Sequence, residues 1–163
     1  MTRQRLTNEN WGFDSNCFVC EPRNAAGLRI PFFHDDEASS VQAEFTLDDA
    51  FSGAPSYVHG GVTLAILDEA QAWATIAVCG KFAVTTETTT KFHRPVRVGR
   101  TFVVEATIAE QSDGEIRTRA QVRNESGKVC TESTAIFTVL AEATAVDAIG
   151  VDVDTIGREH LRD

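Results

Sequence analysis

The feature that most constrains the fold is one long helical pattern set among strand-like runs. Apolar residues repeat at helical spacing from about Gly61 to Val78. They gather on one face, at Val62, Ile66, Trp73, Ile76 and Ala77. This segment is apolar nearly all round, so more than one element must cover it.

Strand-like patterns lie on both sides of this helix in the sequence. Apolar and polar residues alternate over 40–47, and "GLRIPFF" just before it predicts the other strand of a hairpin. Four more runs follow the helix, at 82–94, 101–111, 115–124 and 129–140, separated by the turn segments "PVRVG", "SDG" and "ESG".

One helix beside about six antiparallel strands predicts an α+β domain in which a curved antiparallel sheet wraps one long central helix. A two-layer domain covers only one side of that helix. We therefore expect a second copy of the chain to cover the rest.

The composition is that of a folded globular protein. The 163 residues are 42% hydrophobic and 24% charged, enough for one domain with a sizeable core. We expect an irregular N-terminal arm over 1–25, the domain over 26–141, and an acidic tail over 142–163. The formal charge of −9 opposes non-specific nucleic-acid binding. Without an apolar signal segment or a membrane-length apolar run, the expected location is cytoplasmic.

Four cysteines in a chain with no secretion signal favour reduced thiols. Cys17 and Cys20, in "CFVC", have the spacing of zinc-binding pairs, but Cys79 and Cys130 are solitary rather than a second close pair. We therefore expect a reduced structural loop here, and neither a metal nor a cofactor.

The positive charge is concentrated in "KFHRPVRVGR", which holds Lys91, Arg94, Arg97 and Arg100. On an acidic chain this cluster can be a local anion site. It can equally be a solvated strand end and turn, and the sequence leaves both interpretations open.

The stretch "VHGGVTLAILDEA" combines a helix start with two carboxylates. Gly60 and Gly61 allow a ligand to approach the backbone closely, and the first turn of a helix offers unpaired N–H groups at the positive end of its dipole. This arrangement suits an anion or oxyanion pocket. The alternative is that the glycines only shape a tight turn into the helix.

The two carboxylates, Asp68 and Glu69, occupy different sectors of this helix. Glu69 falls in the most apolar sector, whereas Asp68 lies beside Gln71 and Thr75. A poorly solvated carboxylate has a raised proton affinity and can act as a general base near neutral pH. The alternative is an acid held by a partner group in a subunit interface.

Distance along the helix limits how these groups can cooperate. Eight residues separate Gly60 from Asp68, about 12 Å along a helix. One carbonyl cannot contact both within a subunit, because hydrogen bonds need heavy atoms within about 3 Å. If both act on one substrate, they come from different subunits of a two-fold dimer with two equivalent sites.

These residues resemble a known motif. "HGGVTLAILDEA" is similar to that of hotdog-fold acyl-CoA thioesterases, in the subgroup of the phenylacetate-pathway and human thioesterase-superfamily enzymes. "VTTETTTKFHRPVRVG" resembles their long central strand, and "NCFVCEPRNAAGLRIPF" an N-terminal segment of some members. The resemblance covers roughly residues 15–140.

The resemblance implies a hotdog fold, a homodimer with a continuous sheet, and hydrolysis of an acyl-CoA thioester to free acid and CoA. The sequence leaves open whether two such dimers pair into a homotetramer. It assigns Asp68 as general base or nucleophile and Gly60 as oxyanion N–H donor. Thr85 would hold the water or the carboxylate. The substrate-binding residues would be His59, Gly61, Lys91, His93 and Arg94.

The sequence also departs from the family pattern. Some relatives carry Asn where this chain has Gly53, and other hotdog branches use Glu as the carboxylate, which keeps Glu69 open as an alternative to Asp68. The alternative functions are a non-catalytic acyl-CoA-binding protein and a hotdog hydratase. A hydratase would need an additional His and acid pair, for which we find no motif.

Overall fold

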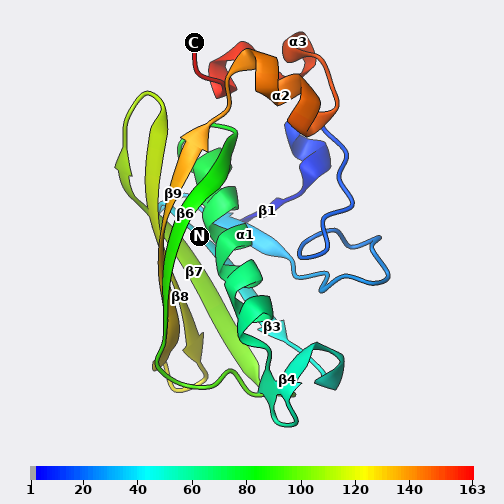
Figure 1. Ribbon diagram of the computed structural model, residues 1–163, viewed down its shortest axis with the longest axis vertical. Coiled ribbons are helices and arrows are strands. Elements are labelled where there is room, and N and C mark those ends of the chain that lie inside the picture. Colours follow the sequence, from blue (N-terminus) through cyan, green and yellow to red (C-terminus); the bar gives the residue numbers. More distant parts are fainter. Residues whose placement is uncertain (1–2) are drawn as a thin grey trace.

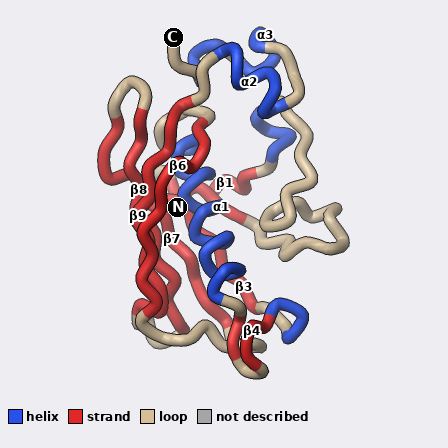
Figure 2. Tube along the Cα trace, in the orientation of Figure 1, coloured by secondary structure: helices blue, strands red, loops and turns tan. Residues whose placement is uncertain are grey.

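The computed structural model describes residues 3–163 as a long helix lying against a curved antiparallel sheet (Figures 1 and 2). Seven strands pair in the order β1-β2-β3-β7-β8-β9-β6, with every neighbouring pair antiparallel. They are β1 (Arg3–Leu6), β2 (Phe32–Asp35), β3 (Ser40–Thr46), β6 (Ala83–Phe92), β7 (Thr101–Gln111), β8 (Glu115–Asn124) and β9 (Val129–Val139). A separate hairpin of β4 (Ser52–Ala54) and β5 (Tyr57–Val58) leads into the helix.

The central helix α1 (Gly60–Ala77) packs against six strands of the large sheet: β2, β3, β6, β7, β8 and β9. Its sheet-facing side chains include Ile66 and Leu67, both 0% exposed. Burying each such side chain stabilises the fold by about 1.5–3 kcal/mol. Opposite them, the inner face of the sheet contributes apolar side chains such as Phe45, Phe102 and Val104 to the same core.

The predicted α+β arrangement is confirmed. The hairpin before the helix and the four strands after it lie within a few residues of the predicted ranges. The sheet has seven strands rather than about six, because the N-terminal arm contributes β1, which pairs with β2.

The N-terminal arm covers the side of α1 that faces away from the sheet (Figure 1). It contains β1 and a short 3-10 helix, η1 (Asn8–Trp11). Val19 of the arm is buried in the same core as the helix, as is Ile30 just after the arm, and Trp11, Cys17 and Leu28 pack against this core. Part of the helix surface for which we expected a second copy is therefore covered by the chain itself.

The C-terminal segment packs at the end of the helix near the arm (Figure 1). It holds α2 (Glu142–Ile149), α3 (Val153–Ile156) and the 3-10 helix η3 (Arg158–His160). These surround Phe82, whose ring makes edge contacts with Trp11, Phe13 and His160. No helix in the described residues is long and apolar enough to cross a membrane.

Candidate active site

The start of α1 presents one free backbone donor. The His59 ring caps the helix, because its Nδ1 accepts a hydrogen bond from the Gly61 N–H at 2.9 Å. An accepting Nδ1 carries no proton, so the neutral ring is protonated at Nε2. Val62 and Thr63 donate to the His59 carbonyl. Within residues 3–163, the N–H of Gly60 is left without an acceptor.

Gly53 leaves room for the capping ring. A Cβ at this position would lie 3.0 Å from Cδ2 of His59 and 3.1 Å from its Cα. Such contacts are too close for a larger residue unless the histidine moves. The glycine found where some relatives carry Asn therefore fits closely against the histidine.

A shallow depression opens beside the free donor. Its volume is about 260 Å³, and it is lined by Gly60, Tyr57, Phe92, His93 and Arg94 among others. The Phe92 ring lies closest to the glycine, at 3.6 Å from where a Cβ would be. Three residues of the predicted site, Gly60, His93 and Arg94, thus share one surface.

Asp68 is paired with a hydroxyl on the neighbouring strand. Thr85 Oγ1 on β6 donates a hydrogen bond of 2.6 Å to Asp68 Oδ1. Both residues are half-buried. The hydrogen bond fixes the carboxylate in one orientation while solvent still reaches the pair, an arrangement suited to holding a reactive acid.

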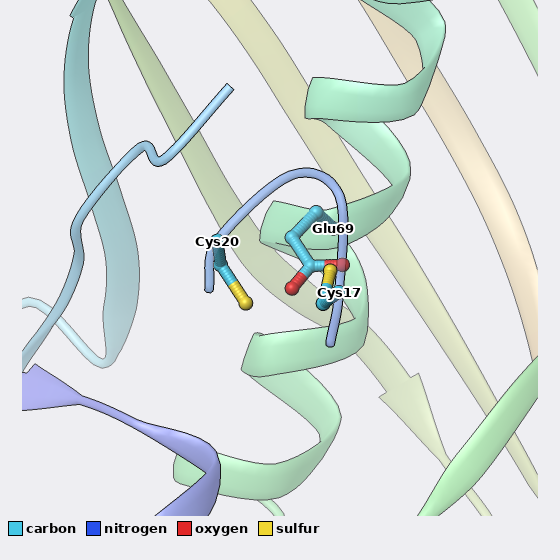
Figure 3. A group of neighbouring side chains, drawn as sticks. All are labelled: Cys17, Cys20 and Glu69. Atoms are coloured by element: carbon cyan, nitrogen blue, oxygen red, sulfur yellow. The ribbon is translucent and has the colours of Figure 1, made fainter. Parts of the chain in front are cut away.

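Glu69 faces the N-terminal arm instead. Its carboxylate lies against Cys17 and Cys20, as Figure 3 shows. Burial raises the pKa of Glu69 to about 7. The neighbouring Cys20 thiol lowers the pKa of Cys17 to about 5, and the same contact raises the pKa of Cys20.

A β-bulge in β6 decides which of its residues face the helix. The register with β9 shifts between Thr85 and Glu87, so Thr85 and Phe92, on opposite sides of the bulge, both pair with buried residues of the inner face. Without the bulge their odd spacing would place them on opposite faces.

Lys91 consequently lies on the outer face of the sheet. It pairs with Glu132 and lines an outer-face hollow with Glu105, Arg119 and Gln121. The structure therefore does not bring Lys91 to the same face as Gly60 or Asp68.

The other basic residues are distributed over two surfaces. His93 Nε2 lies 3.3 Å from Glu132 Oε1, and Arg94 Nη1 donates to the Val129 carbonyl at 2.7 Å. Arg94 also lines a second depression of about 430 Å³ together with Arg97 and Arg100. These three arginines share the hollow with Glu125, and the local anion site considered from the sequence stays a prediction.

Within one chain, the donor and the acid are at opposite ends of β6. Gly60 lies beside Phe92, whereas Asp68 bonds to Thr85. Sequence reasoning did not single out Phe92, nor did it connect Glu69 with the cysteines of the arm. For Phe92, the sequence signal was an aromatic residue near the end of a predicted strand.

Comparison with known families agrees with this architecture. Residues 56–131, from the β4–β5 turn through α1 to the first residues of β9, match the model of the Thioesterase superfamily. The fold around this segment is the hotdog fold. A comparison with curated protein sequences finds no match.

Solved structures share the fold over most of the chain. A thioesterase superfamily protein is 27% identical with a TM-score of 0.67, and the match covers 72% of this chain but only 57% of that one. A putative thioesterase from Ralstonia eutropha JMP134, described as phenylacetic acid degradation-related, is 24% identical with a TM-score of 0.63, covering 73% and 91%. A Streptococcus mutans UA159 protein bound to acetyl-CoA is 17% identical with a TM-score of 0.59, covering 62% and 81%.

Proposed function

We propose that this protein is an acyl-CoA thioesterase in which two chains share each active site. The observation that carries this proposal is the Asp68–Thr85 pair on a free edge strand, with the unpaired Gly60 N–H at the other end of that strand. The match of residues 56–131 to the model of the Thioesterase superfamily supports the reaction class.

The chemistry divides between the two groups. The Gly60 N–H, at the positive end of the α1 dipole, would stabilise the negative charge that develops on the thioester oxygen. Asp68 would take a proton from a water molecule that attacks the carbonyl carbon, or would attack it directly. The carbon–sulfur bond then breaks, and the products are the free acid and CoA with its thiol.

The edge strand explains how two chains would complete one site. β6 ends the sheet, so its outer hydrogen-bonding groups are available to a second copy of β6. Antiparallel pairing centred on Thr89 would place Thr85 opposite Phe92 of the partner subunit, because the bulge adds one residue between Thr85 and Glu87. Asp68 would then face the helix start of the other chain.

Asp68 fits this role better than Glu69. Its partner Thr85 lies on the edge strand where a second chain would bind. Glu69 has the raised pKa expected of a base, but its carboxylate is covered by Cys17 and Cys20 of its own arm. Access to substrate therefore favours Asp68, and the raised pKa of Glu69 follows from that cover.

Recognition of CoA would use the positive groups near the helix start. Arg94 lines both depressions, the one beside Gly60 and the one that it shares with Arg97 and Arg100. Guanidinium groups bind phosphate oxygens in bidentate geometry. Two solved relatives are described as bound to acetyl-CoA or with coenzyme A.

The first test removes each group separately. Gly60→Pro deletes the backbone N–H of residue 60. Proline is tolerated at the first helical position, and His59 already has the extended backbone (φ −58°, ψ 135°) that a following proline requires. We expect turnover of an acyl-CoA panel to fall about 100-fold or more for this variant and for Asp68→Asn. Gly60→Ala, which keeps the N–H, should lose far less.

The second test asks whether the site is shared. When Asp68→Asn and Gly60→Pro chains are mixed and exchange subunits, half of the dimers are heterodimers. Each heterodimer has one intact site if the donor and the acid of a site come from different chains, and none if they come from the same chain. We expect activity to recover to about a quarter of the wild-type level. Full-activity Asp68→Asn would contradict the catalytic assignment. Inactive variants that do not complement would contradict the shared site.

Free-thiol detection across the same panel separates a thioesterase from a non-catalytic acyl-CoA-binding protein. Binding of acyl-CoA without release of thiol from any member of the panel would favour the latter. Straight-chain and aryl substrates should both be included, because the acyl group is not evident from the sequence.

A further inference from the structure

Three potential metal ligands converge where the arm crosses the central helix. The sulfur atoms of Cys17 and Cys20 and a carboxylate oxygen of Glu69 all lie within 4.8 Å of one another. Figure 3 shows the two thiols, carried by one turn of the arm, and the glutamate, carried by α1, directed toward a common point. All three residues are half-buried.

The turn that carries the cysteines is arranged to hold a thiolate. Val19, two residues after Cys17, donates its backbone N–H to the Cys17 sulfur at 3.4 Å. The turn is closed by a hydrogen bond of 3.1 Å from the Glu21 N–H to the Cys17 carbonyl. Backbone N–H groups directed at a sulfur orient it and favour the charged form that binds metals.

The distances are close to those of a tetrahedral zinc site. Zinc–sulfur bonds of about 2.3 Å and zinc–oxygen bonds of about 2.1 Å at tetrahedral angles place sulfur atoms about 3.8 Å apart and sulfur and oxygen about 3.6 Å apart. The observed group, within 4.8 Å, would need to contract by about 1.2 Å at most. Rotation of the two cysteine side chains and of the Glu69 side chain is sufficient for this.

We propose that Cys17, Cys20 and Glu69 bind one Zn²⁺ ion that fixes the N-terminal arm to the central helix. Two thiolates and a carboxylate form a donor set that suits zinc and leaves a fourth position for water. The sequence pattern indicated only two of the ligands, which is why we expected no metal. The third comes from a helix far along the chain.

The test uses the full-length protein purified under reducing conditions without chelator. We expect about one zinc per chain, and Co²⁺ substitution should give the sulfur-to-metal charge-transfer and visible bands of a tetrahedral thiolate site. Cys17→Ser, Cys20→Ser and Glu69→Gln should each weaken zinc affinity by at least about 10–100-fold, measured by competition with a chromophoric chelator. Cys79→Ser, which removes a solitary half-buried thiol, should leave the affinity unchanged.

Two results would overturn the proposal. One is the absence of thiolate bands from the Co²⁺-loaded wild-type protein, which can be measured even if a variant fails to fold. The other is a disulfide between Cys17 and Cys20 in the reduced preparation, detected as a mass two hydrogens lower with no metal bound. Neither result bears on the proposed hydrolase, because thioester cleavage is measured independently.

Discussion

Single polar side chains in the core differ in whether they have a partner. Gln71 on α1 donates from Nε2 to Thr118 Oγ1 on β8 at 2.9 Å, and both residues are 1% exposed. Thr131 on β9 is fully buried, and its hydroxyl has no hydrogen-bond partner among residues 3–163. The buried hydroxyl of Thr118 therefore links helix to sheet, whereas that of Thr131 carries an uncompensated desolvation free energy.

The same substitution should consequently have opposite effects at these two positions. Thr118→Val leaves the Gln71 amide unsatisfied and should lower the free energy of unfolding by about 1–3 kcal/mol. Thr131→Val removes an unpaired hydroxyl and should be neutral or stabilising by about 1 kcal/mol. Urea denaturation measures both. Equal losses would mean that Thr131 has a partner in solution.

At the scale of elements, β6 combines an open edge with exposed apolar residues. Val84 and Phe92 are 45% and 56% exposed. Edge strands of soluble proteins usually carry charges or other devices that prevent pairing. β6 carries only two charged residues, Glu87 and Lys91, which are of opposite sign and stand among threonines and apolar residues. The strand is therefore suited to pair with another strand, as the proposed dimer requires.

A lysine on this edge should weaken the dimer. Val84→Lys is expected to raise the dimer dissociation constant about ten-fold or more, because charged edges oppose strand pairing, and activity should fall at concentrations where monomers form. Val103→Lys is the matched control, since Val103 is also partly exposed, at 37%, but lies on the interior strand β7. Analytical ultracentrifugation measures both. An unchanged Val84→Lys dimer would exclude β6 from the interface.

At the scale of the whole molecule, the N-terminal arm and the C-terminal segment both pack against one aromatic residue, Phe82. Phe82, 4% exposed, follows α1 and contacts Trp11 and Phe13 of the arm and His160 of the C-terminal segment. Lys81 beside it donates from Nζ to the carbonyls of Glu159 and Leu161, at 2.7 and 2.9 Å. Arm, helix and tail thus form one packed unit.

Loss of that ring should destabilise both ends. Phe82→Ala is expected to cost about 3–5 kcal/mol in the free energy of unfolding, because it removes an aromatic side chain from a filled core. Limited proteolysis should then cleave first within the arm and the C-terminal segment. Phe18→Ala, at a residue 53% exposed, should change stability by only about 0.5 kcal/mol. Comparable losses in the two variants would contradict the central role of Phe82.

Much of the architecture could be predicted from the sequence alone. The period-two pattern over 40–47 and the helical pattern over 61–78 depend on neighbouring residues, so they indicate β3 and α1 directly. The motif from His59 to Asp68 likewise indicated the free donor at the helix start and the acid in the middle of the helix. The helical rise per residue indicated that these two groups are too far apart to meet in one chain.

Only the tertiary structure decided which side chains face one another. One extra residue in β6, at the bulge after Thr85, turns Phe92 toward the helix and Lys91 away from it. Contact between Glu69 and the arm cysteines joins residues remote in sequence. Local periodicity is set by the backbone geometry of each element, whereas strand register and the path of the arm depend on packing between distant segments, which no short pattern contains.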